Sequence, residues 1–190
     1  MTGPHRAYMT ALLNLVKSYH VDAGTVLKGT VINPDEKITP RALSKICERA
    51  IRLTGDPALG LRYGTQVNVN NHGIVGYALM SSRTVGRAVD LLLKYNNVLA
   101  PGIEVERVTE KDECRIQCTP RRPSDLSRFF VEAFMGSLVT SLKDLLGDDA
   151  SSLRVEFAGD PPVGSVDYAE LASVPVRFKQ SNNAVIFDAS

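Results

Sequence analysis

The sequence predicts an α+β domain in which a helical first half packs on an antiparallel sheet of about four or five strands. Three observations predict this class. Apolar residues recur at helical spacing through the first hundred positions, they alternate with polar residues from position 103 onward, and one long apolar helix interrupts the strands. A chain of 190 residues is long enough to bury a sizeable core, so we expect residues 1–190 to form a single domain.

The chain begins with an amphipathic helix, predicted over residues 5–20 from apolar residues at helical spacing. A short helical turn is expected at residues 23–28. Residues 33–37 (NPDEK) then interrupt both the helical and the strand periods, which is typical of a polar loop.

The next helix carries clear signals at both ends. Thr39 is a good N-cap, and Pro40 suits the first helical position because the missing N–H would be unpaired there anyway. Gly55 provides a left-handed stop, and a short helix is expected over residues 57–64. The predicted buried stripe of the capped helix is Leu43, Ile46, Cys47, Ala50 and Leu53.

Residues 73–80 are predicted to be helical, with Gly73 and Gly76 on one face where they let another element approach closely. Ser82 is expected to cap the following helix, which we expect to end before Pro101 and to lie at the centre of the fold. The predicted stripe of that helix is Val85, Ala88, Val89, Leu92, Tyr95 and Leu99.

The second half changes to an alternating period. Residues 103–108 and 114–118 are predicted to be two strands of a hairpin, and residues 125–146 a long helix. Pro175 indicates an edge strand or a strand start. A third strand is expected at residues 153–157, and a second hairpin is expected from residues 174–178 and 184–187.

Charge and composition argue against several classes of protein. The 22 basic and 21 acidic residues leave a formal net charge of +1, whereas a chain that binds nucleic acid usually carries a basic stripe. The sequence has no run of about 18 apolar residues, so it predicts no membrane span, and its first residues lack the apolar core of a signal peptide. The three cysteines, an odd number, fit reduced thiols, and we expect a cytoplasmic protein.

No residue pattern in the sequence is typical of catalysis. The three histidines share no metal-ligand spacing. Cys114 and Cys118 are expected to be core residues about 13 Å apart on one face of a strand, too far apart to bridge or to share zinc. The glycines of residues 60–64 and 73–76 fit close packing better than a phosphate loop. The sequence therefore predicts a binding or sensing module without catalytic residues, cofactor or metal.

Several short segments occur in a fixed order, and together they suggest a family. They are residues 54–64 (TGDPALGLRYG), 72–82 (HGIVGYALMSS), 84–89 (TVGRAV) and 91–95 (LLLKY). This series resembles the N-terminal effector domain of one branch of AraC/XylS-type bacterial transcription regulators. That branch is labelled arabinose-binding-like and differs from the cupin sensor of the arabinose regulator itself. The resemblance covers almost the whole chain.

The resemblance implies a cytoplasmic sensor that binds a small molecule or mediates dimerisation, and that controls a C-terminal helix-turn-helix domain. Nothing after Gly147 presents a recognition helix. We therefore expect that domain to be absent from this chain, and DNA to be contacted only through it. A homodimer would find an edge at residues 163–171 and in the last hairpin.

The candidate effector contacts are polar and aromatic groups near the central segments, namely Arg62, Tyr63, His72, Tyr77 and Tyr95. Arg62 suits a carboxylate in a bidentate pair, while Tyr77 and Tyr95 also stand where helix-packing residues are expected. The alternative is a stand-alone sensor for a small ligand or haem, with His72 or His20 as axial ligand.

Overall fold

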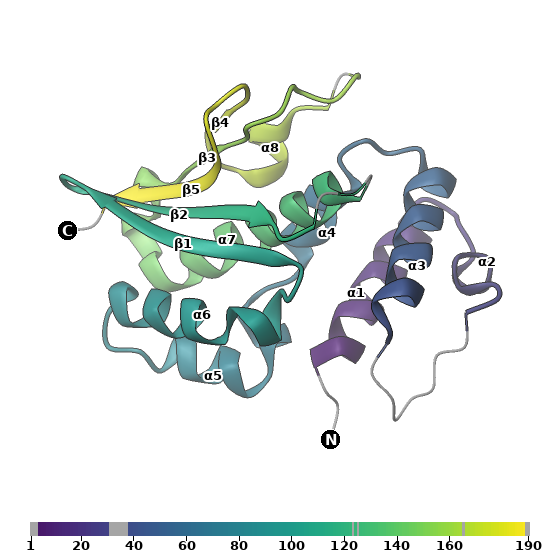
Figure 1. The fold of residues 1–190 in the computed structure, drawn as a ribbon, viewed down its shortest axis with the longest axis horizontal. Coiled ribbons are helices and arrows are strands. Elements are labelled where there is room, and N and C mark those ends of the chain that lie inside the picture. The colour runs from purple at the N-terminus through teal and green to yellow at the C-terminus, as the bar shows by residue number, and fades with distance from the viewer. Residues whose placement is uncertain (1–3, 31–37, 123, 125, 165, 189–190) are drawn as a thin grey trace.

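The fold was analysed in a computed structural model, which describes residues 4–30, 38–122, 124, 126–164 and 166–188. It has the predicted α+β architecture (Figure 1): a sheet is packed against helix α7, with α5 and α6 beside it and a separate group of helices, α1 to α3, next to α4. The α-helices are α1 (Pro4–Ser18), α2 (Ala23–Leu27), α3 (Pro40–Thr54), α4 (Leu59–Gln66), α5 (Ile74–Met80), α6 (Val85–Leu99), α7 (Ser127–Leu146) and α8 (Tyr168–Ala172), and the 3₁₀ helices are η1 (Val69–His72) and η2 (Gly147–Ser152).

The first three helices confirm the sequence prediction. Thr39 caps α3, because its hydroxyl accepts a hydrogen bond from the third residue's N–H at 3.2 Å, and Gly55 ends the helix with a φ of 64°. Asp22 caps the short helix α2 through its carboxylate, which lies 2.8 Å from the backbone nitrogen of Thr25. The predicted loop at residues 33–37 lies outside the described residues.

The sheet has the order β1-β2-β5-β3-β4. The predicted hairpin is confirmed, and its antiparallel register places Val105 opposite Cys118. Cys114 and Cys118 are both buried, as the sequence predicted. The strands are β1 (Ile103–Glu110), β2 (Glu113–Pro120), β3 (Arg154–Glu156), β4 (Val176–Arg177) and β5 (Asn183–Asp188).

The second predicted hairpin is wrong. Strands β4 and β5 are consecutive in the chain, but β3 lies between them, and β4 pairs parallel with β3. The sheet is therefore mixed and not purely antiparallel. Parallel neighbours need a crossover, and helix α8 lies in the connection that provides it. Pro175 fits the predicted edge position, since its carbonyl accepts a hydrogen bond from Val155 while β4 forms the edge of the sheet.

Helix α7 lies at the centre of the fold, and α4 approaches it closely because glycines stand at the contact. A Cβ on Gly64 would lie 2.3 Å from the carbonyl oxygen of Ala133, and one on Gly136 would lie 2.9 Å from that of Leu61. Backbone atoms cannot yield to such contacts without a shift of one helix. The close-packing role predicted for the glycines of residues 60–64 is thus confirmed.

Helix α6 differs from the prediction in position and in its N-cap. The cap is Thr84, whose hydroxyl accepts a backbone N–H at 3.2 Å, whereas the hydroxyl of Ser82 donates to a carbonyl in the preceding helix. The central helix is α7 and not α6, because α6 buries one face and leaves the other in solvent. The buried residues of α6 are Ala88, Val89, Leu92 and Asn96.

The two glycines of the predicted helix at residues 73–80 have different roles. Gly76 allows the expected close approach, because a Cβ there would lie 1.8 Å from the carbonyl oxygen of Val69. Gly73 precedes α5 and has no neighbour within 4 Å of a Cβ. Its φ of 61° with a ψ of −133° explains the glycine instead. Leu53, predicted to be buried, is 38% exposed at the end of α3.

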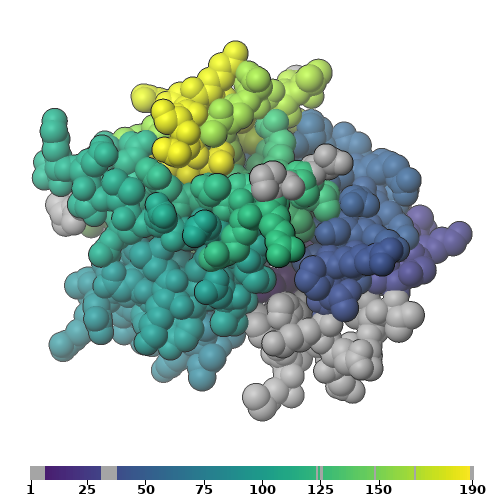
Figure 2. All heavy atoms as spheres, in the orientation of Figure 1, coloured from purple at the N-terminus to yellow at the C-terminus, as the bar shows by residue number. Residues whose placement is uncertain are grey.

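Two hydrophobic clusters form the interior of the described residues. The smaller cluster joins α1, α2 and α3 to the start of α7, and it includes Leu12, Ile46 and Phe129. The larger cluster joins the sheet to α4, α6 and the rest of α7. We call the boundary between the two clusters the seam. Figure 2 shows the purple and blue N-terminal helices and the teal residues of α6 and the first hairpin as two adjoining parts of one face.

Candidate functional site

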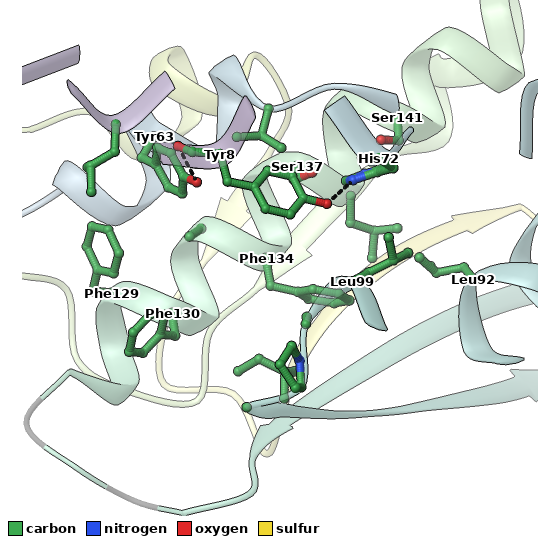
Figure 3. A pocket seen from close by; sticks show the side chains of 18 of the residues that line it. Tyr8, Tyr63, His72, Leu92, Leu99, Phe129, Phe130, Phe134, Ser137 and Ser141 are labelled. Carbon is green, nitrogen blue, oxygen red and sulfur yellow. Dashed lines mark hydrogen bonds between the residues drawn. The ribbon is translucent and has the colours of Figure 1, made fainter. Parts of the chain in front are cut away.

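A cavity of about 480 Å³ lies in the seam. Its walls come from both clusters: α1 and α3 supply one side, α6 and the start of β1 supply another, and α7 runs along it. The volume lies within the range of pockets that hold drug-sized ligands. Most of the lining residues are aliphatic or aromatic, and Figure 3 shows several of them pointing toward one another from separate helices.

The α7 wall combines small and aromatic side chains. Ala133, Ser137 and Ser141 are four residues apart, so they lie on one face of the helix, and all three line the cavity. Phe130 and Phe134 flank this stripe on the cavity side. The small residues leave space that larger side chains would fill, and the aromatic rings make the remaining surface apolar.

A tyrosine–histidine pair supplies a polar point on the wall. The Tyr8 hydroxyl from α1 lies 2.6 Å from Nδ1 of His72 at the end of η1, and both residues line the cavity (Figure 3). Burial lowers the pKa of His72 to about 4, so the imidazole is neutral at pH 7. Burial also raises the pKa of Tyr8 to about 12. The pair is therefore uncharged under physiological conditions.

Tyr63 fixes this pair from the neighbouring helix α4. Its hydroxyl donates to the carbonyl oxygen of Tyr8 at 3.1 Å, and its ring stacks on Phe129 with the centroids 5.9 Å apart. Burial raises the pKa of Tyr63 far above its usual value. Tyr63 thus links α1, α4 and α7 at one end of the cavity.

Ser141 presents an unsatisfied polar group beside the cavity. The residue is 7% exposed, and its hydroxyl oxygen is buried without a hydrogen-bond partner among the described residues. Such a group costs about 1–3 kcal/mol when it loses water and gains no partner. At this wall the hydroxyl can bond to a polar group that enters the cavity, once the Ser141 side chain rotates toward it.

Two of the five sequence-predicted contacts reach the cavity. Tyr63 and His72 line it, whereas Arg62, Tyr77 and Tyr95 do not. Tyr77 is 76% exposed and Tyr95 is 36% exposed, so the packing role considered for Tyr77 is wrong. The ligand-binding role of the five residues stays a prediction, and the geometry favours Tyr63 and His72. His20, the other histidine considered for iron, is exposed in the turn after α1.

Arg62 is held elsewhere by an ion pair. Its Nε lies 2.7 Å from Oδ2 of Asp56, which is buried and also accepts a hydrogen bond from the Tyr19 hydroxyl. Burial raises the pKa of Asp56, but the bonds from Tyr19, the backbone of Ala58 and Arg62 outweigh it and hold the pKa below its usual value. Arg62 therefore balances a structural carboxylate.

A second charged network joins α7 to α8, away from the cavity. Glu132 is 2% exposed, and its carboxylate accepts hydrogen bonds from Arg128 at 2.7 Å and from the Tyr168 hydroxyl at 2.8 Å. Burial raises the pKa of Glu132, and its two partners lower it only in part. This network connects α8 to α7, and its residues do not line the cavity.

The polar residues that the sequence analysis missed come from segments far apart in the chain. Tyr8 lies on α1, Ser44 lies on α3, and Ser137 and Ser141 lie on α7. One signal for the serines of α7 is readable in the sequence, because small residues repeat every four positions in an otherwise apolar helix. Tyr8 carried no such signal.

Neither a metal site nor a membrane span is found in the described part of the chain. No group of three or more His, Cys, Asp and Glu side chains is placed there to hold a metal ion. All three cysteines are buried and unpaired with one another. No helix in that part is both long enough and apolar enough to cross a bilayer.

Sequence comparisons identify relatives among transcription regulators. Residues 22–190 match the family described as the arabinose-binding domain of AraC transcription regulators, N-terminal. The ornithine utilization regulator of Pseudomonas aeruginosa is 34% identical over 181 residues, covering 92% of this chain and 53% of that protein. An uncharacterized HTH-type transcriptional regulator of Mycobacterium tuberculosis is 23% identical, covering 96% of this chain and 57% of that protein. The chain thus spans about half the length of these curated relatives.

Solved structures share the fold at low sequence identity. The transcriptional regulator CdpR from Pseudomonas aeruginosa superposes with a TM-score of 0.60 and 20% identity, covering 93% of this chain and 54% of that one. An oxygen-binding H-NOX domain related to soluble guanylate cyclases superposes with a TM-score of 0.51 and 14% identity, covering 99% of this chain and 94% of that one. At these identities the likeness concerns the fold alone.

Proposed function

This chain belongs to the family of N-terminal arabinose-binding domains of AraC transcription regulators, and from that membership we propose that it is the effector-sensing half of such a regulator, with the cavity in the seam as its effector site. The partner it controls would be a helix-turn-helix DNA-binding domain. DNA contact would occur through that domain and not through this chain, whose net charge is +1.

The position of the cavity carries this proposal. A molecule in the cavity would touch α1 and α3 on one side and α6 and α7 on the other, so it would add contacts between two clusters that already share Phe130 at their boundary. A ligand shifts an equilibrium only by its preference for one state. A molecule that binds only when the two clusters are closed would favour that state, and the DNA-binding domain would respond to it.

Three further expectations accompany the proposal. The chain would act in the cytoplasm, where regulators meet DNA, and it would catalyse no reaction, since the cavity wall resembles a binding pocket more than a catalytic site. Dimerisation would use the edge of the sheet at β4 or the segment at residues 163–171, where Val163 is 97% exposed. Analytical ultracentrifugation with and without a β4 substitution tests the dimer, because β4 is an edge strand that can pair with another chain.

Haem is the alternative ligand. Two observations support it: the similarity of the fold to the H-NOX domain and the neutral His72 on the cavity wall. The residues present fit haem poorly. Its two carboxylates need cationic partners, and the described lining contains no Lys or Arg. The nearby Arg62 is already paired with Asp56. We therefore favour a smaller organic effector.

Metabolite capture tests the proposal. The purified protein is incubated with a bacterial metabolite extract, re-isolated, and analysed by mass spectrometry for retained compounds. Ser137→Leu, which fills the cavity from α7, is the control. We expect a compound that the wild-type protein retains and the variant does not. Equal retention by both proteins, or by neither, would contradict the cavity as an effector site.

A further inference from the structure

We propose that the cavity takes an uncharged, largely apolar molecule with a single neutral hydrogen-bonding group, held beside the Tyr8–His72 pair and Ser141. This inference rests on the proposed function and adds the chemical class of the effector. This ligand class excludes ornithine and arabinose, the two compounds after which related proteins are named. Ornithine carries three charged groups at neutral pH, and arabinose carries several hydroxyl groups.

The described lining has no charged side chain, which favours an uncharged ligand. Those residues include no Asp, Glu, Lys or Arg. Four arginines stand next to a lining residue in the chain: Arg62 pairs with Asp56 and Arg128 with Glu132, each at 2.7 Å, and Arg41 and Arg87 have exposed side chains that do not line the cavity. A charged ligand group would lose its water without gaining an opposite charge, which is strongly unfavourable. Amino acids and carboxylates are therefore poor ligands.

The lining has few polar side chains, which favours a ligand with few polar groups. The hydroxyl and imidazole groups on the wall are those of Tyr8, Ser44, Tyr63, His72, Ser137 and Ser141, and Tyr63 already donates to a backbone carbonyl. A sugar of this size brings several hydroxyl groups, and each one buried without a partner is costly. A molecule with one polar group makes better use of this wall.

The Tyr8–His72 pair has one hydrogen-bond donor left for the polar group of the ligand. A neutral His72 has one N–H, and Tyr8 has one O–H. Their mutual bond uses one hydrogen, whichever residue donates it, so the pair keeps one free donor. Ser141 adds a hydroxyl without a partner, on the stretch of α7 that faces the pair (Figure 3). A carbonyl or hydroxyl oxygen of the ligand can accept from the pair and, after the Ser141 side chain rotates, also bond to that hydroxyl.

Two dyes with the same ring skeleton test the charge requirement. N-phenyl-1-naphthylamine is uncharged, and 1-anilinonaphthalene-8-sulfonate differs by one sulfonate group. Both fluoresce strongly in apolar surroundings, and the chain contains no Trp that would interfere. We expect the uncharged dye to bind one per chain with a Kd at least 100-fold lower than that of the sulfonate. We also expect 1-decanol to displace it, whereas decanoate, L-ornithine and L-arabinose at the same concentration do not.

Matched variants place the dye in the cavity. Ser137→Leu and Ala133→Leu fill it from two successive turns of α7 and should each weaken binding of the uncharged dye at least tenfold. Ser151→Leu, at an exposed position away from the cavity, should bind like the wild type. Circular dichroism and thermal unfolding confirm that each variant is folded, and two independent filling variants guard against one that is not.

Four results would overturn the inference. They are a Kd for the sulfonate dye within tenfold of that for the uncharged dye, displacement by decanoate as effective as by 1-decanol, dye binding unaffected by both filling variants, and one-to-one haemin binding with a Soret band that His72→Ala abolishes. A charged compound recovered by metabolite capture would overturn the ligand class while leaving effector sensing intact. Capture of no compound would instead contradict the proposed function.

Discussion

Replacing Ser141 with Ala should make the free protein more stable and its cavity a weaker binding site. The Ser141 hydroxyl is buried without a partner among the described residues, and such a group costs about 1–3 kcal/mol. The substitution removes the hydroxyl and leaves the Cβ in place, so little apolar packing is lost. We expect a net gain of about 1–2 kcal/mol in the free energy of unfolding, which for a domain of this size raises the Tm by roughly 2–8 °C.

Urea unfolding followed by circular dichroism measures this gain as a higher midpoint at an unchanged slope. Ser82→Ala is the matched control, because the Ser82 hydroxyl donates to the carbonyl of Ala78 at 3.0 Å and its removal should be neutral or slightly destabilising. In the same protein samples, displacement of the naphthylamine dye by 1-decanol should weaken in Ser141→Ala. A loss of stability of 1 kcal/mol or more in Ser141→Ala would refute the reasoning, since the hydroxyl would then be satisfied in the free protein.

Three further predictions test the surroundings of the cavity. Burial holds the pKa of His72 at about 4, below its unfolded value of about 6.5. The free energy of unfolding should therefore be constant above pH 6.5 and fall as the pH drops toward 4, by an amount on the order of 3 kcal/mol. Proton NMR of the imidazole measures the pKa, and His72→Phe should reduce this pH dependence. Gly76→Ala should destabilise by about 3 kcal/mol or more, because its Cβ would lie 1.8 Å from the carbonyl oxygen of Val69; an unchanged urea midpoint would contradict this packing. Arg62→Ala should lower stability by about 1 kcal/mol through the loss of its bond to Asp56, with no effect on dye affinity; a weaker dye complex would place Arg62 at the site after all.

The sequence predicts those features of the fold that local chemistry determines. Thr39, Pro40 and Gly55 define α3 because capping depends on residues within one turn. The first hairpin follows from alternation over two short runs separated by a polar turn. The centre of the fold was misplaced, because α6 and α7 are both apolar and only packing shows that α7 is covered on most sides.

Features that depend on contacts between segments far apart in the chain could not be predicted from the sequence. The parallel pairing of β4 with β3 is set by a crossover through α8, whereas the sequence suggested a hairpin between neighbours. The cavity is a similar case, because its polar groups come from α1, α3, α4, η1 and α7, which are brought together only by the fold. Arg62 illustrates the reverse error: an arginine suited to a carboxylate had a carboxylate partner six residues away, in Asp56.

The most direct test of the account is whether filling the cavity changes the DNA affinity of the proposed regulator, in which this chain is joined to a helix-turn-helix domain. Fluorescence anisotropy with labelled operator DNA measures its Kd with and without saturating captured ligand, in the wild type and in Ser137→Leu. Allosteric coupling of ordinary strength changes affinity roughly 5- to 150-fold. We predict a change of at least fivefold in the wild type and none in the variant. An operator affinity that is the same with and without ligand in the wild type would contradict the central claim.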